Sequence, residues 1–201
     1  MKIYVYIWRQ GFSEEDTAKL LKASTMLSTV GNMGADEAST ALTSIINGFG
    51  MATDQATHVI DTLDALDLSY ATSTQELADG LQRSASVAKT AGMSFEDLAS
   101  IMTVVSSTTR LSGETIGNGM KSLFSRLQNI KVGKYLSDEG EALNDTEKVL
   151  NHLGVTLRDS ATSWKDPMEV LDEVGKKWKS LTDIDRSAIA TALNKTGAIV
   201  V

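Results

Sequence analysis

The chain has no cysteine, a single proline, few aromatic residues and no long hydrophobic run. Without cysteine it can form neither disulfides nor thiolate metal sites, and the redox compartment stays undetermined. Its one proline, Pro167, leaves the other segments free to form uninterrupted helices. No apolar run approaches the roughly 20 residues that a membrane-spanning helix needs. The net charge of −7 disfavours general affinity for DNA or anionic lipid, which requires concentrated Lys and Arg.

The remaining composition is that of a globular protein. At 201 residues, with 42% hydrophobic and 22% charged residues, the chain can bury one substantial core or two small ones. Apolar side chains recur at spacings of three and four, the period of an amphipathic helix. This pattern predicts six helices in the first two thirds of the chain, over 13–30, 35–47, 54–68, 74–90, 94–107 and 113–130.

Hydroxyl and acidic residues mark several of the predicted helix starts. Ser73 and Ser94 each stand three residues before an acid, Glu76 and Asp97, an arrangement that satisfies free amide groups at a helix N-terminus. Asp166 before Pro167 is a further start signal. Glycines in the intervening segments, as in 48–50, are typical of helix ends.

An internal repeat links the two halves of this helical region. Residues 11–21 resemble residues 92–102 at an offset of 81, with Gly, Ser, Glu, Asp and Ala at identical places. Positions 36–46 then resemble 114–124 at an offset of 78. The sequence therefore predicts a twice-used helical hairpin, with three extra residues in the turn of the first copy.

The first ten residues depart from this pattern. The run from Ile3 to Trp8 is apolar, β-branched and aromatic, which is compatible with a strand. It falls short of a signal peptide, because its apolar part is under about 7 residues and no small-residue cleavage site follows. Our hypothesis is that the N-terminus is interrupted, the helix equivalent to 74–89 having been lost or replaced in this copy.

After residue 130 the character of the sequence changes. A basic, glycine-containing link at 131–134 and a polar stretch at 137–144 precede a short helix over 146–153. Alternating apolar and polar residues allow a small β-hairpin near 155–165, which needs helices to pack against. A helix starting at Asp166 and a last one from Thr182 through Ala190 complete the chain. We expect three regions: an atypical segment 1–10, a repeated helical region 11–130 and a C-terminal helical region 131–201.

Two runs of this all-α, multi-helix array resemble a known family. The run 84–98 (SASVAKTAGMSFEDL) followed by 113–121 (GETIGNGMK) combines a helix, a Gly-Met-Ser-x-Glu-Asp turn, a helix, a Gly-x-x-x-Gly turn and another helix. This composite pattern is similar to the core region of phage tail tape measure proteins, found in phages and prophages. The likeness covers residues 11–193, and the departure of 194–201 from it suggests a segment of a longer protein.

The resemblance implies a structural role. The parent protein would set tail length, scaffold the assembly of the tail tube and lie in the tube lumen before genome ejection, or in the host cytoplasm during assembly. Its partners would be the tail tube, other tail assembly proteins and further copies of itself. Short glycine-marked helices without a sustained heptad favour a globular module over an extended ruler. Helical hairpins with small apolar stripes suit stacking along an axis.

No catalytic, cofactor-binding or metal-binding residue is predicted, and no small-molecule substrate. His58 and His152 lack a second ligand at metal-binding spacing. The acids of 14–16 and 96–97 fall in first helical turns, where they favour the helix dipole. Gly113, Gly117 and Gly119 form no phosphate loop and are better explained by close helix approach.

Two alternatives stay open on the sequence. A cell-wall-cleaving tail enzyme would need a catalytic acid in a cleft, for which Glu76, Glu96 and Glu114 are the residues to test. A module contacting membrane or DNA during genome ejection would use the modest basic patch of Lys121, Arg126, Lys131 and Lys134.

Overall fold

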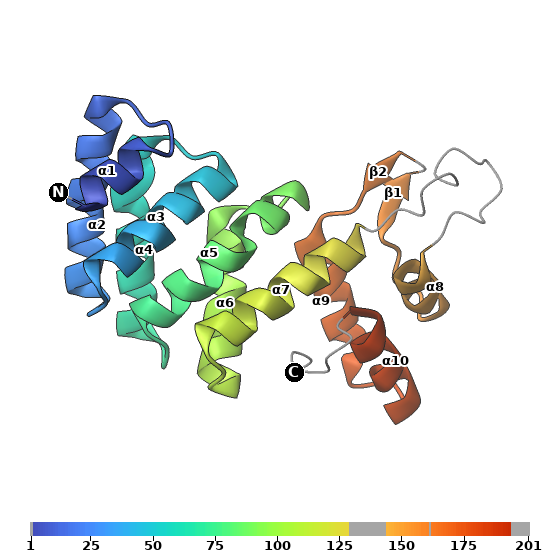
Figure 1. Ribbon diagram of the computed structural model, residues 1–201. Coiled ribbons are helices and arrows are strands. Elements are labelled where there is room, and N and C mark those ends of the chain that lie inside the picture. The colour runs from blue at the N-terminus through green and yellow to red at the C-terminus, as the bar shows by residue number, and fades with distance from the viewer. Residues whose placement is uncertain (1, 129–143, 161, 194–201) are drawn as a thin grey trace. The chain divides into compact units, whose positions relative to one another are not determined.

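The predicted all-α, multi-helix array is confirmed by the computed structural model, which describes residues 2–128, 144–160 and 162–193 (Figure 1). Its described part contains ten α-helices, one 3₁₀ turn and one two-stranded sheet. The elements are α1 (Lys2–Trp8), α2 (Glu14–Val30), α3 (Ala35–Phe49), η1 (Thr53–Gln55), α4 (Ala56–Ser69), α5 (Thr74–Thr90), α6 (Phe95–Thr109), α7 (Gly113–Leu127), α8 (Asp145–His152), β1 (Arg158–Ser160), β2 (Ser163–Trp164), α9 (Pro167–Trp178) and α10 (Asp183–Leu193).

The chain divides into two compact units. Unit 1 comprises residues 1–89 and 94–118, and unit 2 comprises residues 90–93 and 119–201. The division falls within α7, whose first turns belong to unit 1. The three-region division expected from the sequence stays a prediction.

Unit 1 is built from helical hairpins in two layers. We call α2 with α3, α4 with α5, and α6 with α7 hairpins 1, 2 and 3. The second helices of these hairpins begin at residues 35, 74 and 113, a spacing of 39 residues each time. Helices α1, α3 and α5 lie in one layer and α2 and α4 in the other (Figure 1). The core between the layers is largely aliphatic, with Leu20, Leu42, Leu63, Leu81 and Leu98 fully buried.

Matching turns lead into the first helix of each hairpin. Gly11, Gly50 and Gly92 all adopt positive φ angles, of 94°, 65° and 95°. Glycine is favoured there because a Cβ atom would be strained in this conformation. Ser13 and Ser94 then cap α2 and α6, each accepting from the backbone amide of an aspartate, Asp16 or Asp97, at 3.0 and 3.1 Å. The predicted start signals at both positions are confirmed.

The offset between hairpins 1 and 3 arises differently from our expectation. Helix α2 has 17 residues and α6 has 15, while α3 and α7 have 15 each. Two of the three additional residues therefore lengthen the first helix, and one lies in the turn. Their assignment to the turn alone was wrong, because sequence offsets do not show where a helix ends.

The strand suggested for the N-terminal run is also wrong. Residues 2–8 form α1, with Ile7 fully buried and Ile3, one turn earlier, partly buried against the hairpins. Contacts with α2 and α3 override the β propensity of this aromatic, β-branched segment. The seven-residue helix ends three residues before Gly11, as α5 ends shortly before Gly92. A helix at this place is therefore shortened rather than lost.

Unit 2 contains the remaining elements, including the small hairpin that the alternation allowed. Strands β1 and β2 pair antiparallel, and Arg158 lies opposite Trp164. Asn144 caps α8 in a reciprocal pair with Glu147, at 2.9 and 3.0 Å. Asp166 caps α9 through the amide of Met168 at 2.7 Å, as its position before Pro167 predicted.

Candidate functional site

The contact surface between successive hairpins of unit 1 is the best-defined candidate site. Side chains one hairpin apart meet in both layers. In one layer, the hydroxyl of Thr53 donates to Asp16, and His58 lies 2.8 Å from Glu96. In the other, the side-chain amide of Gln75 donates to Glu37 at 3.1 Å. These partners are separated by 37 or 38 residues, close to the spacing of the hairpins themselves.

Bare backbone makes the closest of these contacts, between α5 and α7. A Cβ atom built on Gly117 would lie 2.5 Å from the carbonyl oxygen of Gly80 and 2.9 Å from its Cα. One built on Gly113 would collide with the carbonyl oxygen of Glu76. The prediction that glycines allow close helix approach is confirmed for Gly113 and Gly117. Helix α5 also crosses α3 closely, since a Cβ on Gly48 would meet the Cβ of Ala85 at 2.6 Å.

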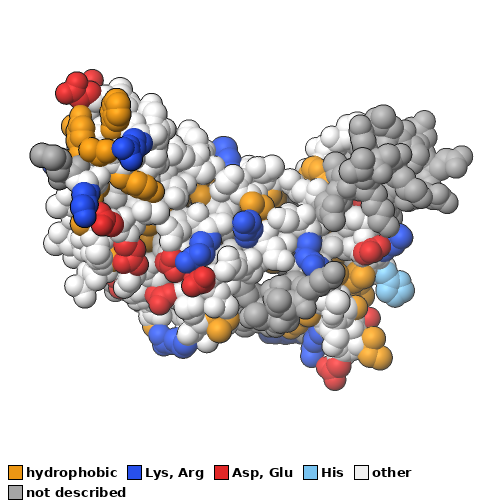
Figure 2. Space-filling model, viewed as in Figure 1, with side chains coloured by type: hydrophobic (Ala, Val, Ile, Leu, Met, Phe, Trp, Pro, Cys, Tyr) orange, Lys and Arg blue, Asp and Glu red, His pale blue; other side chains and the backbone are white. Residues whose placement is uncertain are grey.

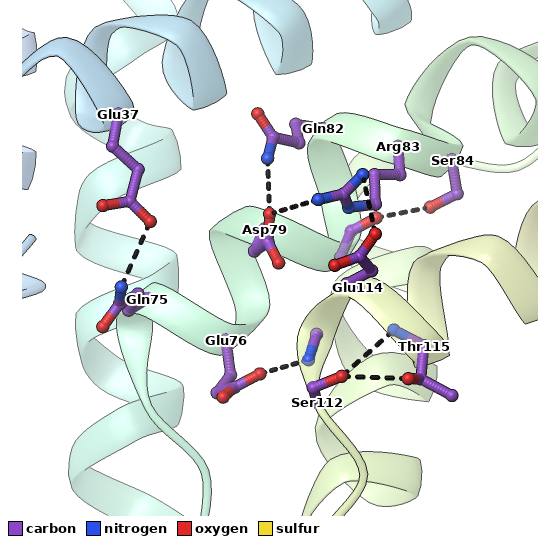
Figure 3. Close-up of polar contacts among 12 residues, drawn as sticks. Glu37, Gln75, Glu76, Asp79, Gln82, Arg83, Ser84, Ser112, Glu114 and Thr115 are labelled. Carbon is purple, nitrogen blue, oxygen red and sulfur yellow. Dashed lines mark hydrogen bonds and ion pairs between the residues drawn. The ribbon is translucent and has the colours of Figure 1, made fainter.

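Polar side chains surround this glycine contact (Figure 3). The carboxylate of Glu76 accepts from the backbone amide of Gly113, the first residue of α7. This pairing places a negative charge at a helix N-terminus, where the helix dipole favours it. One turn further along α5, Arg83 lies between two carboxylates, 3.3 Å from Asp79 and 3.6 Å from Glu114. The charges therefore orient α5 against the start of α7.

A shallow hollow of about 310 Å³ adjoins Glu76 at the loop edge of unit 1. It is lined by Ala71, Thr72, Ser73, Glu76, Ser106, Arg110 and Leu111. Its polar groups are engaged with one another: Arg110 donates to the carbonyl of Ala71, and the hydroxyls of Thr72 and Ser106 lie 2.9 Å apart. Glu76 is the one acid in this lining, so the hollow does not assemble the carboxylate pair that acid/base hydrolysis commonly uses.

The other acids named as catalytic candidates have partners elsewhere. Glu96 hydrogen-bonds His58, and this bond holds the pKa of the Glu96 carboxyl below its ordinary value. Both side chains are about half exposed, so their ion pair adds little stability. Glu114 pairs with Arg83. The structure therefore gives Glu76, Glu96 and Glu114 three separate surroundings rather than one site.

The histidine and basic candidates are likewise dispersed. His152 is exposed in the last turn of α8. Arg126 donates to the carbonyls of Thr191 and Ala192, at 3.3 and 3.1 Å, near the end of α10. Lys131 and Lys134 lie outside the described residues. Within the described ranges no group of three or more His, Asp or Glu side chains is arranged to hold a metal ion. No helix in those ranges is long and apolar enough to cross a bilayer.

The sequence analysis missed the middle hairpin of the series. Its offsets of 78 and 81 compare hairpins 1 and 3, which stand two spacings apart. A signal for hairpin 2 is present: Gly50-Met51-Ala52-Thr53-Asp54 follows the pattern of Gly92-Met93-Ser94-Phe95-Glu96. Alanine replaces the capping serine there, and the entry into α4 is the 3₁₀ turn η1. The loss of that hydroxyl hid the shorter spacing.

Taken together, the described residues define an all-helical protein whose built surfaces are contacts between helices. Such an arrangement is typical of structural and assembly proteins. A sequence model of the family described as phage-related minor tail protein matches residues 1–194, and the chain belongs to this family. It is therefore a structural phage tail protein, associated with the virion or with its assembly and with other tail components. No solved structure matches the chain.

Proposed function

We propose that the chain is part of a tape measure protein, which sets the length of the phage tail and scaffolds the assembly of its tube. Membership of the minor tail family supports a tail role in general. The finer assignment rests on the composite pattern of 84–98 and 113–121, whose residues form α5, the capped start of α6 and the glycine contact of α7. This role requires binding to the tail tube and to further copies, in the tube lumen, and no catalysis.

The three hairpins are proposed to be copies of one helical unit of about 39 residues. The equal spacing of α3, α5 and α7 and the three positive-φ glycines support this reading. In such arrays each unit packs on its neighbours, so stability is shared along the series. The repeated region would then act as a folded module of the parent protein, with residues 131–201 as a distinct region after it.

The proposed role is tested by particle morphology. In a phage or inducible prophage that encodes this chain, a strain lacking it is expected to form no tails or tails of uncontrolled length in electron micrographs. A Gly117→Ala allele should shift particles in the same direction at a temperature where the altered chain unfolds. A Gly175→Ala allele, at an exposed position with nothing within 4 Å, serves as the matched control and should give normal tails.

Tails of normal number and length in the deletion strain would exclude the length-setting role. If such particles also adsorbed normally but failed to penetrate the cell wall, the cleaving-enzyme alternative would gain support. Membership of the minor tail family would stand in either case.

A further inference from the structure

An apolar and basic surface lies on α1, which we call the α1 patch: Lys2, Val5, Tyr6, Trp8 and Arg9. Val5, Tyr6 and Trp8 are 38%, 43% and 57% exposed, although the opposite side of the same helix buries Ile7 completely. Figure 2 shows hydrophobic side chains gathered beside Lys and Arg at this end of unit 1. Exposed aromatic residues in such number mark interaction surfaces rather than ordinary solvent-facing positions.

A second exposed surface has the complementary composition. It lies on the C-terminal half of α4, and we call it the α4 patch: Asp61, Asp64, Ala65, Leu68 and Tyr70. Leu68 is 82% exposed and Tyr70 is 55% exposed. Asp61, Asp64 and Leu68 follow one another at spacings of three and four, so they share a helix face.

The charges of the two patches are opposite and unused. No Lys or Arg occurs between Lys22 and Arg83, whereas eight Asp and Glu residues do. The residues that the structure describes give Asp61, Asp64, Lys2 and Arg9 no ion-pair partner. A surface with apolar centre and free cations therefore exists on the same chain as one with apolar centre and free carboxylates.

We propose that the α1 patch of one copy docks on the α4 patch of a second copy. Contact would bury Trp8 and Tyr6 against Leu68 and Tyr70, and place Lys2 and Arg9 beside the two aspartates. Because the two patches differ, the interface is heterologous, and each copy keeps one free patch for a further copy. This inference deepens the self-association named in the proposed function by giving its surfaces.

Association of the purified chain is the first test. Light scattering after size-exclusion chromatography should show a mass that rises with protein concentration and falls with salt, because exposed charges are screened. Trp8→Ser should weaken the apparent Kd about tenfold or more, as central aromatic residues dominate such interfaces. Ile184→Ser is the control, since Ile184 is 80% exposed on α10 outside both patches and its replacement should change nothing.

A charge exchange identifies the partners unambiguously. Lys2→Glu with Arg9→Glu, and separately Asp61→Lys with Asp64→Lys, should each abolish association while circular dichroism shows unchanged helix content. Mixing the two altered chains should restore it, because every new contact then joins opposite charges again. Association that no charge reversal disturbs, or altered chains that stay apart on mixing, would overturn the proposal.

Two further outcomes would also refute it. A chain that stays monomeric at all concentrations has no such interface. One that stays monomeric yet binds vesicles of anionic phosphatidylglycerol through the α1 patch would show that a lipid surface is the occupant instead. Neither outcome affects the length-setting role, which is tested by particle morphology.

Discussion

Replacing Gly117 with alanine is expected to lower the free energy of unfolding by about 1–3 kcal/mol, the cost of forcing an extra carbon into a packed contact. The new Cβ would lie 2.5 Å from the carbonyl oxygen of Gly80, well inside the van der Waals distance. Since the obstacle is backbone on both sides, no side-chain rotation relieves it. Helices α5 and α7 must move apart, which also weakens the bond between Glu76 and the amide of Gly113.

The control has the opposite sign. Gly175 is exposed within α9, and a Cβ built there meets nothing within 4 Å. Alanine favours a helix over glycine by about 1 kcal/mol, so Gly175→Ala should stabilise the protein. Urea unfolding of both variants measures the difference. Equal stabilisation by both replacements would show that α5 and α7 do not touch through their backbones.

Replacing Arg158 with methionine should lower the free energy of unfolding by about 3–5 kcal/mol, the cost of leaving a buried charge unpaired. Glu147 is 1% exposed and receives two bonds from the Arg158 guanidinium, at 2.5 and 2.9 Å. The guanidinium also stacks over Trp164, 4.7 Å from the ring centroid. Removing it leaves the Glu147 carboxylate with the capping bond to Asn144 alone among these contacts.

A second substitution separates charge from packing. Glu147→Gln added to Arg158→Met removes the unpaired charge and keeps the cap, since glutamine can also bond back to the first residue of the motif. The double variant should therefore be more stable than the single one. Lys176→Met breaks the exposed pair with Asp172 and should cost under about 1 kcal/mol. Similar losses for Lys176→Met and Arg158→Met would contradict a buried pair that supports unit 2.

Local signals in the sequence predicted most helices and their starts. Ser13, Ser94 and Asp166 cap helices where their spacing placed them, because capping depends on residues within one turn. The helix α1 was missed because its residues favour strands and only contacts with α2 and α3 make them helical. Tertiary packing of this kind leaves no local signal.

The candidate site was only partly predictable for the same reason. The glycines of α7 indicated close approach, but their partner on α5 lies 37 residues away and no spacing rule identifies it. The pair of Glu147 and Arg158, 11 residues apart across α8 and β1, is equally invisible until the chain is folded. The spacing of 39 residues was hidden where Ala52 stands in place of a capping serine.

Crosslinking of engineered cysteines tests the hairpin array most directly, and the absence of native cysteine gives it a clean background. His58→Cys with Glu96→Cys, and Glu37→Cys with Gln75→Cys, place thiols on adjacent hairpins. Ser13→Cys with Ser94→Cys places them at equivalent positions two hairpins apart. In dilute protein with a short bifunctional reagent, the first two pairs should crosslink within one chain and the third should not. Crosslinking of the Ser13 and Ser94 positions, with none between adjacent hairpins, would contradict the array.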